Sequence, residues 1–154
     1  MASIELICVG ELKFSELNGV AARYEKRIAA FVPFSLRKLK EIKGVSEDVV
    51  LKRETRSILD HLKKDDYVIG LHAAGKKMDS EGFAKFLGDR LLYGNRRLVF
   101  VIGGFAGFSE AMDQRSDQKL SFSDMTFSHD LFRVLFLEQL YRALTIIKGL
   151  PYHR

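Results

Sequence analysis

The chain has 154 residues, of which 47% are hydrophobic and 29% charged; this is typical of one globular domain, which we expect over residues 1–154. Cys8 is the only cysteine, which excludes an internal disulfide and a cysteine metal cluster, and no signal-peptide core or membrane-spanning run is present, so we expect a cytoplasmic protein with no membrane association. The net charge of +5 favours an anionic partner.

Strand and helix signals alternate in the first half. Residues 4–9 are an apolar run that predicts a buried strand, and residues 17–31 show helical spacing. The alternation of apolar and basic residues predicts an edge strand at 35–42. Ser46 is placed to cap a helix that extends to residue 62.

The alternation continues in the second half. Residues 67–71 predict a buried strand, followed by a loop at 72–77 and a helix that Asp79 or Ser80 caps and that ends near residue 93. A third buried strand at 97–102, a short helix at 109–115 and a brief strand at 119–122 follow. The last helix, 130–148, ends at Gly149. The whole pattern predicts an α/β fold, with a mainly parallel sheet sandwiched by helices.

The basic excess lies mainly in the first half. Residues 1–77 contain 15 lysines and arginines against 11 acidic residues, whereas residues 78–154 contain 10 against 9. We expect the first half to face an anionic partner, although solvated surface charges would give the same composition. The candidates are Arg37, Lys38, Lys40, Lys43, Lys52, Arg53, Arg56, Lys76 and Lys77.

Three predicted strand ends carry glycine or small polar residues, at Leu71, Gly103 and Phe122. Ligands of parallel sheets bind beyond such ends, so we expect the three loops to form one pocket. Residues 103–107 do not fit the dinucleotide fingerprint and could simply turn the chain. Residues 122–127 interleave apolar and polar side chains, which suits an adenine ring but is also compatible with an ordinary loop.

Hydrolytic and metal chemistries have little support in the sequence. The four histidines show no H-x-x-x-H spacing, and no G-x-S-x-G motif is present, so we expect no metal site. The last helix is apolar on more than one face, which predicts a two-fold dimer or, alternatively, a central helix of a monomer. Glu138 and Arg142, four residues apart, could pair on its surface.

Several segments together resemble the ribosomal large subunit methyltransferase H family. The resemblance covers the whole chain and is carried by Val9-Gly10, residues 24–27, Leu71 with Gly75-Lys76, residues 101–104 with Gly107, residues 120–127 with His129, residues 133–135, residues 138–143 and the terminal Tyr152-His153-Arg154. One departure is Ser128, which stands where family members commonly have proline and which we expect to cap the last helix.

The resemblance implies a SPOUT-class methyltransferase with a C-terminal trefoil knot, acting as a homodimer. The implied activity is S-adenosylmethionine-dependent methylation of pseudouridine N3 in large-subunit ribosomal RNA. The small basic domain suggests that the shape of the assembled ribosome contributes to recognition, although free RNA stays open as the substrate. The implied cofactor-binding residues are Leu71, Gly103, Phe122, Ser123, Asp124, Met125, Thr126 and Phe127.

The resemblance also suggests roles at the reacting end of the site. We expect His129, His153 and Arg154 to be catalytic, and Arg142 and Tyr152 to place the RNA. If two-fold packing brings one subunit's tail across the other's pocket, each site is shared. Two other classes remain open on the residues alone: a non-catalytic basic RNA-binding module, and a flavodoxin-like nucleotide or flavin protein.

Overall fold

The structure is a computed structural model, which describes residues 2–154. In chain order its elements are β1 (Ile4–Val9), α1 (Ser15–Ala29), β2 (Phe34–Leu39), α2 (Glu47–Asp60), β3 (Tyr67–Lys77), α3 (Ser80–Tyr93), β4 (Leu98–Ile102), α4 (Glu110–Arg115), β5 (Gln118–Ser121) and α5 (His129–Ile147). Strands and helices alternate as the sequence predicts, with most bounds shifted by one to three residues.

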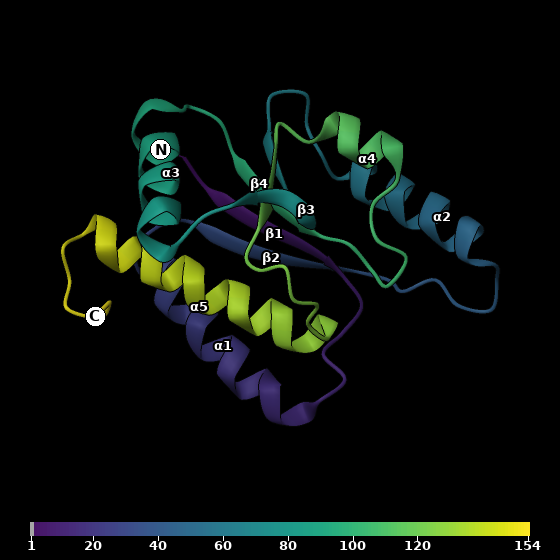
Figure 1. The fold of residues 1–154 in the computed structure, drawn as a ribbon, viewed down its shortest axis with the longest axis horizontal. Helices are drawn as coiled ribbons and strands as arrows, with labels where there is room; N and C mark the ends of the chain where they lie inside the picture. The colour runs from purple at the N-terminus through teal and green to yellow at the C-terminus, as the bar shows by residue number, and fades with distance from the viewer. Residues whose placement is uncertain (1) are drawn as a thin grey trace.

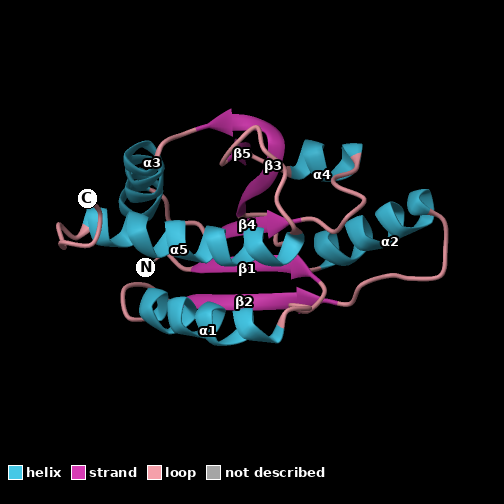
Figure 2. Ribbon diagram, turned by 60° about the horizontal axis from the view of Figure 1, so that its bottom comes forward, coloured by secondary structure: helices cyan, strands magenta, loops and turns pink. Residues whose placement is uncertain are grey.

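All five strands belong to one parallel sheet in the order β2-β1-β4-β3-β5. Helices α1, α3 and α5 cover one face of the sheet, and α2 and α4 cover the other (Figure 1). In Figure 2 the arrows of β1, β2 and β4 point in the same direction, whereas the end of β3 curves away from them. The predicted α/β class is therefore confirmed, and the predicted edge strand is β2.

Alternating side chains of the central strands fill two cores. Leu6 and Phe100 face the layer of α1, α3 and α5, whereas Ile7 and Val101 face the layer of α2 and α4. All four side chains are fully buried, as expected for strands covered on both faces. The sheet is thus a rigid platform for the loops at its carboxyl edge.

One predicted boundary is wrong, at the end of β3. We expected the strand to stop at Leu71 and a loop to follow, but hydrogen-bonded pairing with β5 continues to Lys77. The register shifts between Leu71 and Lys76, so that both of these residues face Leu120. A Cβ at Gly75 would come within 2.6 Å of the Leu120 backbone, and this close approach explains why glycine occupies the bulge.

The helix ends largely follow the predicted capping signals. Side chains of Asp79, Ser109 and Ser128 accept hydrogen bonds from backbone N–H groups in the first turns of α3, α4 and α5. Ser46 precedes α2, but its side chain makes no such bond. The last helix ends before Gly149, whose φ of +68° places it in the left-handed region that favours glycine.

Candidate active site

A cavity of about 410 Å³ lies at the carboxyl ends of β3, β4 and β5. The three loops that the sequence singled out all contribute to it, together with the first turn of α5. Its walls comprise residues 71–73, 102–105, 107–108, 120–123 and 125–127, with His129 and Phe132. Parallel strands place their carboxyl ends at one edge of the sheet, which explains why distant segments meet there.

The turn after β4 allows its backbone to line the cavity. A Cβ at Gly103 would meet the carbonyl oxygen of Gly107 at 2.9 Å and the ring of Phe108 at 3.0 Å. Gly107 has a φ of +79°, which other residues adopt only with strain. The glycines therefore keep the turn tight and leave peptide groups at the cavity wall.

The loop after β5 is held by its own side chains. The hydroxyl of Ser121 donates to the carbonyl of Ser123 at 2.9 Å, and the Met125 N–H donates to the Ser123 hydroxyl oxygen at 3.0 Å. Phe122 packs against the rings of Phe132 and Phe136 of α5. The loop thus has one apolar anchor and a polar backbone that faces the cavity.

One predicted cofactor residue lies apart from the others. Leu71, Gly103, Phe122, Ser123, Met125, Thr126 and Phe127 all line the cavity. Asp124 is not part of its lining and instead pairs with Lys77 Nζ at 2.5 Å, on the exposed side of the loop. Its contact stabilises the loop against β3, and its role toward a cofactor stays a prediction.

His129 connects the cavity with the glycine-rich turn. It begins α5, and its Nε2–H donates to the Gly103 carbonyl at 3.1 Å, which leaves Nδ1 as the acceptor of the neutral ring. Burial, and then the charge of Arg133, hold the pKa of His129 below its ordinary value. The imidazole is therefore neutral near pH 7.

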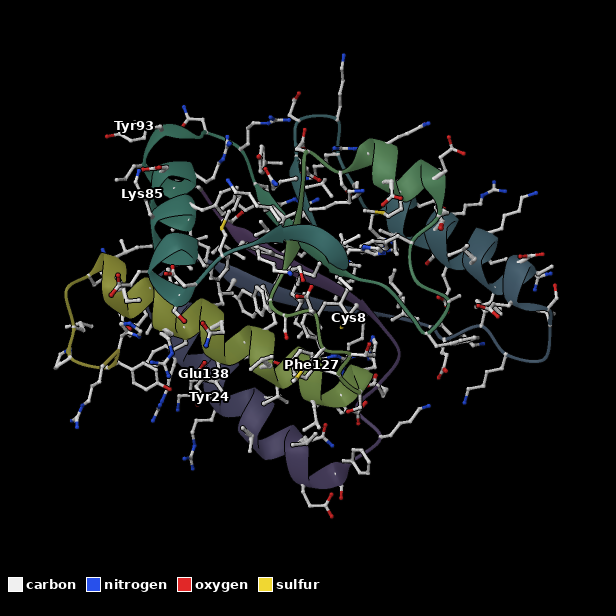
Figure 3. All side chains as sticks on the ribbon, in the orientation of Figure 1. Cys8, Tyr24, Lys85, Tyr93, Phe127 and Glu138 are labelled. Carbon is white, nitrogen blue, oxygen red and sulfur yellow. The ribbon has the colours of Figure 1, made fainter. Side chains whose placement is uncertain are left out.

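The C-terminal tail lies near the other end of α5. Arg142 is thirteen positions after His129 on α5, or roughly 20 Å away at about 1.5 Å per residue. Figure 3 shows Phe127 beside the start of α5, and Glu138 and Tyr24 farther along this helix. Within one chain, Arg142, Tyr152, His153 and Arg154 therefore do not meet His129.

The tail is folded back onto α5 and α1 by a polar network. The Arg142 guanidinium binds the Glu138 carboxylate at 2.6 Å, which confirms the predicted pair, and donates to His153 Nδ1 at 3.1 Å. The Tyr152 hydroxyl donates to Glu138 at 3.1 Å and lies 3.3 Å from the Tyr24 hydroxyl. Burial raises the pKa of Tyr152, so the phenol remains a hydrogen-bond donor. Tyr152 and His153 are half-buried, whereas the terminal Arg154 is exposed.

The structure also reveals two buried charged residues for which the sequence indicated no functional role. Asp130 accepts the backbone N–H groups of Lys13 and Phe14, and Arg133 donates to the carbonyl of Gly10 at 2.8 Å. Both residues join α5 to the segment after β1. Their only signal is that two charged residues stand in the mainly apolar first half of α5.

Some predicted anion-facing residues are engaged within the chain. Arg37 pairs with Glu5, Lys38 with Glu11 and Lys43 with Glu41. Within residues 2–154, no three His, Cys, Asp or Glu side chains are grouped as metal ligands would be. Among the same residues, no helix is long and apolar enough to cross a membrane.

Two solved structures share the fold at low sequence identity. A probable methylase family protein from Haemophilus influenzae superposes with a TM-score of 0.58 and 16% identity, covering 99% of this chain and 71% of that one. A probable methyltransferase from Bordetella pertussis superposes with a TM-score of 0.59 and 12% identity, covering 93% and 95%.

Sequence comparison defines the class and then the family. A family model described as "Predicted SPOUT methyltransferase" matches residues 2–153, so the class is that of the SPOUT methyltransferases. The ribosomal RNA large subunit methyltransferase H of Christiangramia forsetii is 40% identical over 154 residues, with 98% of each chain covered. That of Clostridium kluyveri is 37% identical over 158 residues, with 99% of each covered. This chain belongs to the ribosomal RNA large subunit methyltransferase H family.

Proposed function

We propose that this protein methylates large-subunit ribosomal RNA at N3 of a pseudouridine, with S-adenosylmethionine as the methyl donor. The observation that carries the proposal is the single cavity built by three loops at the carboxyl edge of the sheet, in a chain of this family. The family match over residues 2–153 supports a single methyltransferase domain, in which we expect the C-terminal segment to form a trefoil knot.

The cavity residues fit the chemistry of the donor. An adenosine needs apolar walls for its ring faces and peptide groups at its edge, and Leu71, Phe122 and the Gly103 turn offer both. The volume of about 410 Å³ lies in the range of small-molecule sites. When bound, S-adenosylmethionine supplies a methyl group activated by a sulfonium.

The protein's part in the reaction is positioning and control of a proton. Holding the methyl donor and the acceptor nitrogen in line lowers the barrier to methyl transfer by several kcal/mol. The rigid strand ends and the capped α5 would provide this alignment. The imide nitrogen of the substrate must also lose a proton. His129 is neutral and carries an acceptor nitrogen, and we assign it, with His153 and Arg154, to the surface where this proton leaves.

The separation of His129 from the tail supports a site shared between two subunits. The mouth of the cavity has an apolar rim in which Phe105 is 69% exposed and Met125 is 75% exposed. Leu131 of α5, which lies in sequence between the cavity residues His129 and Phe132, is also exposed. Such a surface suits a second copy of the chain, whose tail would bring His153 and Arg154 to the cavity.

The network around Glu138 gives Arg142 and Tyr152 a defined role in this proposal. They hold the tail in one conformation before RNA arrives, so RNA placement is indirect for Arg142, each of whose three nitrogens already donates to Glu138 or His153. The charge of +5 favours a polyanion. We expect the assembled particle to be the substrate, in the cytoplasm where ribosomes work.

Methyl transfer to ribosomes lacking the modification tests the function. We expect radiolabel from S-adenosylmethionine to enter large-subunit RNA at one pseudouridine. Deletion of residues 152–154 should abolish the transfer while donor binding persists. Ribosomes bound without any transfer would instead support a non-catalytic RNA-binding module. Undiminished transfer by the truncated protein would remove the tail from the mechanism.

A further inference from the structure

A second cavity, of about 240 Å³, adjoins the first at the turn after β4. Gly104, Phe105 and His129 line both cavities. The rest of the second lining comes from the end of β1 and the segment after it, from Glu41, from Glu54 of α2, and from Ser128 and Asp130 at the start of α5. The two cavities therefore meet at the Gly104 backbone.

Glu54 stands out among the buried side chains of residues 2–154. It is 3% exposed, and neither carboxylate oxygen has a hydrogen-bond partner in this part of the chain. The carboxylate lies against the turn, since a Cβ at Gly104 would meet Oε1 at 2.5 Å. A buried carboxylate without a partner is costly, so its retention needs a reason.

The other carboxylates of the second cavity are already engaged. Glu11 pairs with Lys38 at 2.7 Å, and Glu41 lies 3.7 Å from Lys43 Nζ. Asp130 accepts two backbone N–H groups. Glu54 is thus the carboxylate in this cavity whose charge is not compensated within residues 2–154.

We propose that Glu54 forms an ammonium-binding subsite, and that it receives the α-ammonium group of the amino-acid end of S-adenosylmethionine. The inference rests on the proposed function, because it places the adenosine part in the first cavity. An ammonium group is the hydrogen-bond-donating cation of that ligand, and one carboxylate suffices to bind it. A metal ion would require several converging ligands, and these carboxylates are engaged elsewhere.

The environment of Glu54 favours such a partner. Burial raises the pKa of its carboxyl, the nearby N–H of Ile42 lowers it without reaching hydrogen-bonding geometry, and the negative charge of Glu41 raises it again. The ionised form is therefore disfavoured without a cation. A bound ammonium would supply the missing compensation.

Calorimetry with three ligands separates the subsite from the adenosine pocket. S-adenosylhomocysteine carries the ammonium, its deamino analogue lacks only that group, and 5′-methylthioadenosine lacks the whole amino acid. We expect the wild type to bind S-adenosylhomocysteine at least about tenfold more tightly than the deamino analogue, as a charge-assisted hydrogen bond predicts. Equal binding of these two ligands by the wild type would overturn the subsite, without need of any variant.

The same three ligands are then measured with Glu54→Gln. The matched control is Glu47→Gln, a change at an exposed position of the same helix. We expect Glu54→Gln to lose the tenfold preference and to bind 5′-methylthioadenosine within about twofold of the wild type. The control should keep the preference. Retention of the preference in Glu54→Gln would refute the assignment. If the wild type bound none of the three ligands, the proposed function itself would be refuted.

Discussion

The Nε2 atom of His129 lies 3.1 Å from the carbonyl oxygen of Gly103, so that the first turn of α5 is tied directly to the turn after β4. This hydrogen bond joins two segments that both line the first cavity. It also fixes which ring nitrogen carries the proton of the neutral imidazole. The geometry of the cavity and the protonation state of His129 are therefore linked.

We expect His129 to make stability depend on pH. Burial, and then Arg133, lower its pKa in the folded state, so the unfolded chain binds this proton more readily. The contribution of His129 to stability is then fully present above the unfolded pKa of about 6.5 and is lost as the pH falls through the folded value. Urea unfolding of the wild type should show this loss.

His129→Asn removes the titrating group and should flatten that pH dependence. The ring resonances of His129, followed by NMR, should titrate with a midpoint below about 6.5. A midpoint at or above this value would contradict the buried, neutral imidazole, as would an unchanged pH slope in the Asn variant.

Glu138→Gln should release the tail without affecting the cavity. The change weakens the charge-assisted hydrogen bonds to Arg142 and Tyr152, each of which is worth about 1.5–3 kcal/mol. We expect kcat for ribosome methylation to fall by about tenfold or more, while calorimetric donor affinity stays within about twofold. Glu16→Gln, on the exposed surface of α1, should change neither quantity. A variant with normal kcat would show that the network does not position the tail.

Arg97→Met should strongly destabilise the opposite edge of the sheet. Arg97 binds both Glu5 and Asp66, each 2% exposed, and its loss would leave Asp66 without its paired cation and Glu5 with Arg37 alone. We expect the free energy of unfolding to drop by about 3–5 kcal/mol. Lys85→Met, which breaks an exposed pair with Asp89, should cost about 0.5 kcal/mol or less. Similar losses in both variants would contradict this account.

The same network predicts part of the acid sensitivity. Burial would raise the pKa of Asp66, but hydrogen bonds from Arg97 and from the Lys63 N–H outweigh it and lower that pKa. The resulting stability is present above the unfolded pKa of about 3.9 and is lost as the pH falls through the folded value. Arg97→Met should therefore show a weaker loss of stability in this acidic range.

The sequence predicts the fold and the place of the cavity because both follow from local patterns. The apolar run of β4 and the glycines after it are readable without tertiary information, and parallel strand ends must share an edge. The end of β3 is not readable in this way. Residues 72–77 have no strand pattern, and only their pairing with β5 makes them a strand.

Other features depend on contacts between distant segments. In the helical pattern of α2, Glu54 looks like any surface charge, and its burial becomes evident only when the turn at Gly104 packs against it. By contrast, the sequence does indicate that His129 and His153 lie toward opposite ends of the last helix, and the structure agrees. The shared site remains a prediction because it requires a second chain.

The most direct test of the account is a crystal structure with S-adenosylhomocysteine bound. We predict its adenosine between Leu71, Gly103 and the 122–127 loop, with its amino group beside Glu54 and a partner's tail across the cavity mouth. An adenosine bound outside this cavity, or no binding at concentrations that saturate other methyltransferases, would contradict the central claim.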